Sequence, residues 1–105
     1  GGQRVSSKEV EETIYRHPTV QEAAVVGVPD IKLGEAIQAV VVLKTGKTAS
    51  PEDILLVCRQ NLPEYAIPHS VDFVNGLPRN AIGKILKRTL REKYSNKPNT
   101  QSNLS

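Results

Sequence analysis

Two apolar runs rich in β-branched residues constrain the fold of this chain most. Residues 20–28 are mostly valine and alanine, and residues 36–43 form a second such run that a Lys-Thr-Gly-Lys segment closes. β-Branched residues favour strands, so the runs predict two neighbouring strands. The intervening residues 29–35 are too many for a tight two-residue hairpin. We expect an exposed loop there.

Capping signals predict two helices outside these strands. Ser6 followed three residues later by Glu9 is the pattern of a capping box, and it predicts a helix over about residues 7–16. Ser50 followed by Pro51 predicts the start of a second helix, since serine caps a helix N-terminus and proline fits its first position. Both helices have an apolar side that can pack on a sheet.

An apolar stripe with helical spacing predicts a third helix near the C-terminal end. The stripe recurs every four residues and consists of Ile82, Leu86, Leu90 and Tyr94. A basic face lies opposite, made of Lys84, Lys87, Arg88 and Arg91. Lys84 falls in the predicted first turn, where open backbone N–H groups suit a phosphate or carboxylate. The alternative reading is a solvated lysine on a charged face.

Composition limits the class of protein. A chain of 105 residues forms one small domain, and the near absence of aromatic residues leaves a core of valine, isoleucine, leucine and alanine. The net charge is +3, with basic residues concentrated after Arg79. Such clustering fits nucleic acid, a membrane surface or phosphorylated small molecules, and composition does not choose among them.

The cysteine and histidine content argues against a disulfide framework or a metal site. Cys58 is the single cysteine, and its place in an apolar helix face predicts a packed small hydrophobe. His17 and His69 lie far apart in the sequence, so we expect no bound metal. A reducing, cytoplasmic setting is expected, and no run approaches the roughly 20 apolar residues of a transmembrane helix.

These elements together predict an α+β fold. A short strand near Ser70 joins the two apolar runs in a small, mainly antiparallel sheet of about three strands, packed with three helices. The folded domain is expected over residues 1–94. Residues 95–105 hold one apolar residue in eleven, so they predict a disordered C-terminal tail.

Five ordered motifs resemble the C-terminal domain of the adenylate-forming enzymes. The first motif, Gly-Gly-Gln-Arg-Val-Ser-Ser-Lys-Glu-Val-Glu, opens the chain, and Leu-Pro-Arg-Asn-Ala-Ile-Gly-Lys at 77–84 is similar to the last core motif of that superfamily. The others are His-Pro-x-Val with the valine-rich run to Pro-Asp, then Gly34-Glu35, and Leu62-x-x-Tyr-x-x-Pro68. The residues within these motifs resemble those of acyl-CoA synthetases more than those of peptide-synthetase adenylation domains.

The resemblance implies an enzyme that joins a carboxylic acid to ATP and then passes the acyl group to coenzyme A. It assigns the adenylation step to Lys84, and it implies that Gly1 and Gly2 line the pantetheine passage of coenzyme A. Tyr65 matches an aromatic position near the coenzyme A adenine, and Arg79 is a further candidate for binding a cofactor phosphate. The small domain is expected to move on a hinge between the two steps, like a lid.

The rest of such an enzyme would lie in a partner domain. An N-terminal adenylation domain is expected to hold the acid, the ATP phosphates and Mg²⁺, so this chain alone is expected to be inactive. The residues also allow interpretations without a role in catalysis or binding. Gly1 and Gly2 would then be a cloning remnant, Tyr65 a loop tyrosine and Arg79 a solvated cation. Two other functions stay open, a basic nucleic-acid-binding domain and a non-catalytic interaction module.

Overall fold

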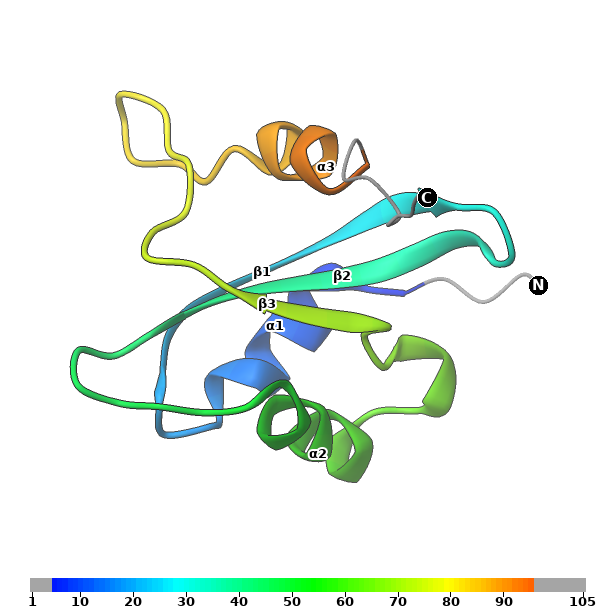
Figure 1. Ribbon diagram of the computed structural model, residues 1–105, viewed down its shortest axis with the longest axis horizontal. Helices are drawn as coiled ribbons and strands as arrows, with labels where there is room; N and C mark the ends of the chain where they lie inside the picture. Colours follow the sequence, from blue (N-terminus) through cyan, green and yellow to red (C-terminus); the bar gives the residue numbers. More distant parts are fainter. Residues whose placement is uncertain (1–4, 96–105) are drawn as a thin grey trace, which may run out of the picture.

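The computed structural model describes residues 5–95, which form three α-helices and three strands (Figure 1). The elements in chain order are α1 (Ser7–Tyr15), β1 (Val20–Asp30), β2 (Gly34–Leu43), α2 (Pro51–Asn61), the 3₁₀ turn η1 (Glu64–Ala66), β3 (Ser70–Phe73) and α3 (Lys87–Ser95). The predicted capping serines are confirmed. Ser6 accepts a hydrogen bond from the Glu9 N–H at 3.3 Å, and Ser50 forms a full capping box with Asp53. None of the helices in this range could cross a membrane, given their length and polarity.

The three strands form one sheet in the order β1-β2-β3. The long β1–β2 pair is antiparallel and the short β2–β3 pair is parallel, so the predicted α+β fold is confirmed with a mixed sheet. A parallel neighbour requires a crossover connection, which residues 44–69 with α2 provide. The predicted tail began at Ser95, but Ser95 is the last residue of α3. Residues 96–105 lie outside the described residues.

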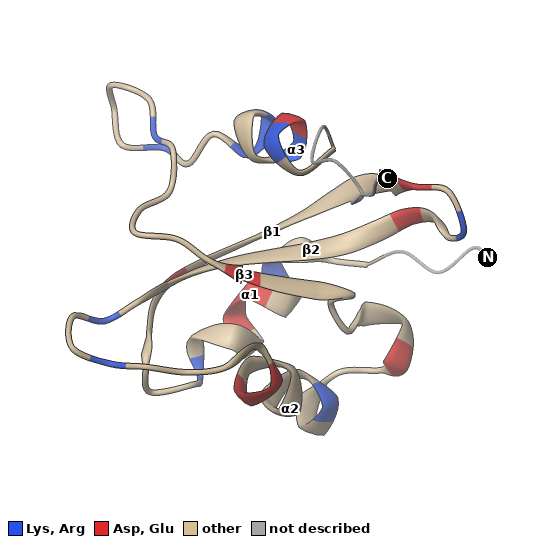
Figure 2. Ribbon diagram, in the orientation of Figure 1, with Lys and Arg blue, Asp and Glu red and all other residues tan. Residues whose placement is uncertain are grey.

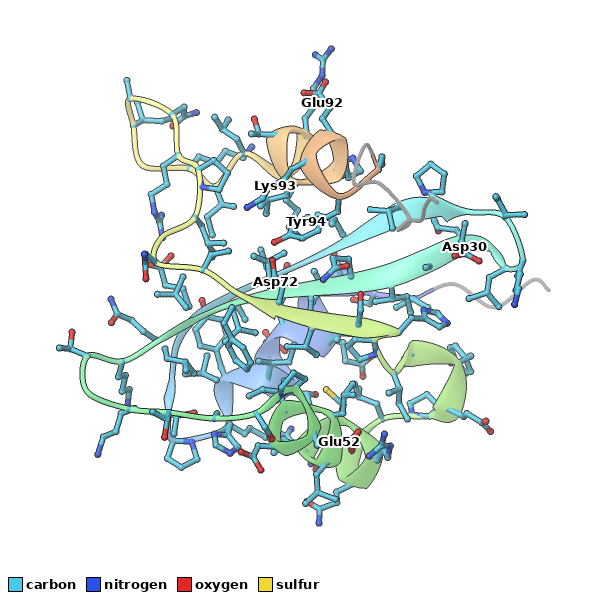
Figure 3. All side chains as sticks on the ribbon, viewed as in Figure 1. Asp30, Glu52, Asp72, Glu92, Lys93 and Tyr94 are labelled. Carbon is cyan, nitrogen blue, oxygen red and sulfur yellow. The ribbon has the colours of Figure 1, made fainter. Side chains whose placement is uncertain are left out.

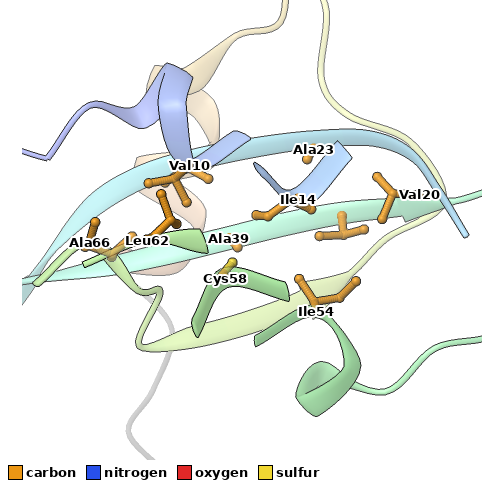
Figure 4. Close-up of a cluster of buried hydrophobic side chains, with 12 residues drawn as sticks. Val10, Ile14, Val20, Ala23, Ala39, Ile54, Cys58, Leu62 and Ala66 are labelled. Atoms are coloured by element: carbon orange, nitrogen blue, oxygen red, sulfur yellow. The ribbon is translucent and has the colours of Figure 1, made fainter. Parts of the chain in front are cut away.

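Helices cover both faces of the sheet. α1 and α2 pack on one face, where Val10, Ile14, Ile54 and Cys58 are almost fully buried (Figure 4), and α3 packs on the other face (Figure 1). Because β1 and β2 are covered on both sides, their sequences are nearly continuous apolar runs rather than alternating ones. Cys58 is a packed core residue, as predicted, and burial raises the pKa of its thiol.

The connection between β1 and β2 is shorter than the predicted seven-residue loop. Pro29 pairs with Glu35 and Asp30 with Gly34, so only residues 31–33 lie outside the ladder. The Asp30 carboxylate accepts hydrogen bonds from two backbone N–H groups of this turn, and Gly34 adopts a φ of 81° that favours glycine. Pro29 is compatible with the sheet because β1 is an edge strand. The tip is exposed, as predicted.

The third helix begins later than predicted, at Lys87 rather than near residue 82. Gly83 adopts a φ of 87°, which a right-handed helix excludes, and the Asn80 side chain binds backbone N–H groups that a helix would use. Ile82 is therefore 86% exposed instead of lying on the apolar stripe. The prediction that Lys84 occupies the first turn of a helix was wrong.

A partly buried hydrogen bond fixes the end of α3 to the sheet. The Tyr94 hydroxyl donates to Asp72 Oδ2 of β3 at 2.5 Å (Figure 3), while the ring packs in the core beneath α3. Burial and then the bond to Asp72 raise the pKa of Tyr94 above its usual value. The hydroxyl therefore stays protonated at a pH where an exposed tyrosine ionises.

Tyr94→Phe is expected to lower the free energy of unfolding by about 1–2 kcal/mol, because it leaves a partly buried carboxylate without this donor. Urea denaturation of the purified chain measures the loss. The matched control is Tyr15→Phe on the exposed face of α1, which should change stability by less than about 0.5 kcal/mol. Equal effects of the two variants would contradict the assigned role of the bond.

The same tyrosine predicts a dependence of stability on pH. The folded-state pKa of Tyr94 lies above the unfolded value of about 10, so the folded chain holds this proton more tightly. The protonated Tyr94 hydroxyl contributes fully to the free energy of unfolding below about pH 10, and this contribution is lost as the pH rises further. The free energy of unfolding of the wild type should therefore fall more steeply with pH across this range than that of Tyr94→Phe. Parallel curves would count against the raised pKa.

Two glycines offer a matched test of the loop that precedes α3. An added Cβ would meet no atom within 4 Å at either Gly76 or Gly83, but only Gly83 has a positive φ. Gly83→Ala is expected to cost about 1–2 kcal/mol of backbone strain. Gly76→Ala should be neutral or slightly stabilising, since it reduces unfolded-state entropy. The urea concentrations at the midpoint of unfolding of the two variants test this expectation. A lower midpoint for Gly76→Ala than for Gly83→Ala would refute it.

Candidate functional site

The segment between β3 and α3 folds into a compact loop. A backbone bridge joins Arg79 and Ile85, and the Leu86 N–H donates to the Pro78 carbonyl at 2.8 Å. Inside this closure the Asn80 N–H donates to the Lys84 carbonyl at 3.0 Å. The segment is therefore a hydrogen-bonded turn, which Figure 1 shows extending away from the sheet on the α3 side.

The Asn80 side chain organises the inside of this loop. Its Oδ1 atom accepts hydrogen bonds from the N–H of Ile82 at 3.1 Å and from the N–H of Lys84 at 3.0 Å. Asparagine commonly binds backbone groups a few residues ahead in this way. Both backbone polar groups of Lys84 are consequently bonded to Asn80.

Arg79 turns its guanidinium back onto the protein. Nη1 donates to the Gly83 carbonyl at 2.6 Å, and Nη2 pairs with the Glu22 carboxylate on β1. Arg79 was predicted to bind a cofactor, and that prediction has no support from this geometry because two of its donor groups are engaged within the domain. The pair ties the loop to the edge strand.

A second ion pair attaches the start of α3 to the opposite layer. Lys87 Nζ lies 2.6 Å from Glu11 Oε2 on α1 and 3.2 Å from the Ser7 hydroxyl. Glu11 also accepts the Val25 N–H of β1 at 2.8 Å. Neither Glu11 nor Glu22 stood out as a contact in the sequence. No local pattern could reveal either contact, because the partners lie 76 and 57 residues apart.

Lys84 is a cation that this arrangement leaves available, as is Arg91 on α3, which has no carboxylate partner within residues 5–95. Its side chain is exposed, and no hydrogen bond or ion pair joins it to another residue within 5–95. It borders a shallow groove between the loop and α3, lined also by Asn80, Ile85, Leu86, Lys87, Arg88 and Arg91. Figure 2 shows that Lys and Arg follow one another along this segment. Lys87 and Arg88 already pair with Glu11 and Glu92.

The other predicted site residues lie elsewhere. Tyr65 is about half exposed in η1, which lies on the α2 side of the sheet, whereas the Lys84 loop lies on the α3 side (Figure 1). The structure therefore does not bring Tyr65 and Lys84 together. Gly1 and Gly2 lie outside the described residues.

The histidines have structural contacts. His69 Nδ1 accepts the Ile37 N–H at 2.8 Å, and His17 Nδ1 lies 2.8 Å from the Thr19 hydroxyl. Across residues 5–95, no cluster of three or more His, Cys, Asp or Glu residues is suited to a metal ion. The arrangement offers an exposed ammonium group to an anion.

Comparison with known proteins extends the view beyond this domain. The chain is 46% identical over 91 residues to crotonobetaine/carnitine–CoA ligase of Proteus mirabilis, which covers 87% of the chain and 18% of that protein. It is 44% identical over 92 residues to long-chain-fatty-acid–CoA ligase of Bacillus subtilis, covering 88% of the chain and 16% of that protein. The chain thus spans less than a fifth of these relatives.

A solved structure has the same fold. ATP-bound MatB from Rhodopseudomonas palustris matches with a TM-score of 0.88 and 41% sequence identity, over 91% of this chain and 19% of that one. The sequence profile of the AMP-binding enzyme C-terminal domain family matches residues 9–84, which include Lys84 and most of the loop. This extent and the agreement in fold leave no support for the nucleic-acid-binding alternative. The chain belongs to the AMP-binding enzyme C-terminal domain family.

Proposed function

We propose that the chain is the mobile C-terminal domain of an ATP-dependent, AMP-forming acyl-CoA ligase, in which Lys84 serves the adenylation step. The observation that carries this proposal is the unpaired Lys84 ammonium on a fixed, exposed loop. It stands in a chain whose relatives are about five times longer and include CoA ligases. A preceding domain is the partner that this loop would meet.

The first half-reaction joins a carboxylate oxygen to the α-phosphorus of ATP and releases pyrophosphate. Negative charge builds on the α-phosphate oxygens as the new P–O bond forms and the old one breaks. An ammonium about 4 Å from such an oxygen interacts with it by roughly 4 kcal/mol at an effective dielectric of about 20. That energy corresponds to about a thousandfold in rate.

The second half-reaction transfers the acyl group from AMP to the thiol of coenzyme A, forming the thioester and releasing AMP. We assign Gly1 and Gly2 to the passage for the pantetheine arm, where a missing side chain lets a ligand approach the backbone. Tyr65 is assigned to contact with the coenzyme A adenine. Its half exposure and its distance from the Lys84 loop across the sheet support a second working face. Arg79 is the least supported cofactor-binding candidate.

The remaining parts of the reaction belong to the proposed N-terminal adenylation domain. That domain would bind the carboxylic acid, ATP and Mg²⁺, since the part of this chain that the structure describes offers no cluster of carboxylates for a metal ion and the groove beside Lys84 is shallow. We propose a cytoplasmic enzyme, in keeping with a chain whose only cysteine is a buried free thiol.

Lys84→Ala in the full-length enzyme is expected to lower pyrophosphate release by at least about a hundredfold, because the transition state loses its cation. Thioester formation from a supplied acyl-adenylate should fall far less. A panel of aliphatic and aromatic acids would first identify a working substrate. Lys47→Ala, which removes an exposed lysine from the β2–α2 loop, is the matched control.

Two outcomes would refute this assignment. Equal losses in both half-reactions would mean that Lys84 does not act specifically in adenylation. A Lys84→Ala enzyme with unchanged activity would instead favour a non-catalytic interaction module of the same fold.

The purified 105-residue chain is expected to show no ligase activity alone, because it supplies a cation but no binding site for acid or ATP. Coupled assays for AMP and for thioester, run with the same acid panel, test this expectation. Detectable acyl-CoA synthesis by the chain would contradict it.

A further inference from the structure

We infer that Asn80 and Arg79 are positioning residues for the adenylation step, which hold the Lys84 backbone in place before the substrate arrives. This inference rests on the proposed role of Lys84. It assigns Arg79 to the protein's own loop rather than to a cofactor phosphate. Neither residue needs to touch the reacting atoms.

Asn80 is placed to fix Lys84 directly. Its side-chain oxygen accepts the Lys84 N–H at 3.0 Å, and its own N–H donates to the Lys84 carbonyl at 3.0 Å. The third contact, from the Ile82 N–H, fixes the apex of the same loop. An ordered backbone spares the transition state the entropy of freezing this segment. Only the lysine side chain is left to adjust.

Arg79 acts on the peptide that precedes Lys84. Its guanidinium holds the Gly83 carbonyl at 2.6 Å and pairs with Glu22, so the loop is joined to the edge of the sheet. Gly83 has a positive φ, and the bond to its carbonyl orients the peptide that leads into Lys84. With Glu22 paired to Arg79 and Glu11 to Lys87, neither of these carboxylates neutralises Lys84.

The loop lies apart from the core, which separates positioning from folding. Arg79 and Asn80 are exposed, whereas the nearest core residues, Leu77 and Leu90, are buried on either side of the loop. Loss of the loop contacts should therefore disorder Lys84 while the sheet and helices persist. A positioning role predicts a change in one half-reaction, and a role in folding predicts losses in both.

The first experiment replaces Asn80 in the full-length enzyme. Asn80→Ala is expected to lower kcat for pyrophosphate release about 10- to 100-fold with little change in KM for ATP. Thioester formation from supplied acyl-adenylate should stay within about twofold of wild type. Asn80→Asp keeps the side-chain acceptor and should recover most of the rate. Asn75→Ala, in the preceding exposed turn, is the matched control and should resemble wild type.

The second experiment tests the Arg79–Glu22 pair by a double-mutant cycle. Arg79→Ala and Glu22→Gln should each slow pyrophosphate release about 3- to 30-fold, and the double variant should be no slower than the worse single one. A cofactor-binding Arg79 would behave differently. Arg79→Ala would then raise KM for ATP or coenzyme A, Glu22→Gln would be silent, and the inference would be overturned.

The outcomes separate this inference from the proposed function. If Lys84→Ala abolishes adenylation while the Asn80 and Arg79 variants match wild type, only the positioning role fails. If Lys84→Ala has no effect, the proposed function fails and the positioning role fails with it. Equal losses in both half-reactions, accompanied by a lower unfolding temperature, would reduce Asn80 and Arg79 to parts of the fold.

Discussion

Burial of the β1–β2 pair on both faces is the constraint on which the rest of the structure depends. The valine-rich strands expose apolar side chains above and below the sheet, so helices must cover each side. α1 and α2 cover one face, and the segment after β3 crosses to the other face, where α3 packs. The loop that carries Lys84 is part of this connecting segment. Packing therefore places the candidate site at the surface, beside the last helix.

Charge pairing inside the domain decides which cations remain available. Arg79 and Lys87 flank Lys84 in the sequence, and each pairs with a carboxylate on the β1 or α1 side of the domain. These pairs connect the loop to β1 and the start of α3 to α1. The basic residues of this segment therefore differ in role, since Arg79 and Lys87 form ion pairs within the domain and Lys84 does not. A count of positive charges does not distinguish them.

Much of the fold followed from local signals in the sequence. The β-branched runs and the serine caps depend on neighbouring residues, and the structure confirms the strands and helices that they predicted. The start of α3 did not follow, because a four-residue apolar period cannot report that Gly83 has a positive φ. Lys84 was found through its motif. Its fixed backbone and the internal use of Arg79 depend on Asn80 geometry and on Glu22, which is distant in the sequence.

The burial of Cys58 has a practical consequence for studies of motion in this domain. The chain contains one cysteine, and its sulfur lies within the core under α2 with no exposed surface. Maleimide reagents attack accessible thiolates, so this thiol should react slowly in the native protein. A cysteine introduced on the surface would then carry a fluorophore or spin label at a single known position. A second introduced cysteine would supply the pair of labels that a distance measurement needs, without prior removal of the native thiol.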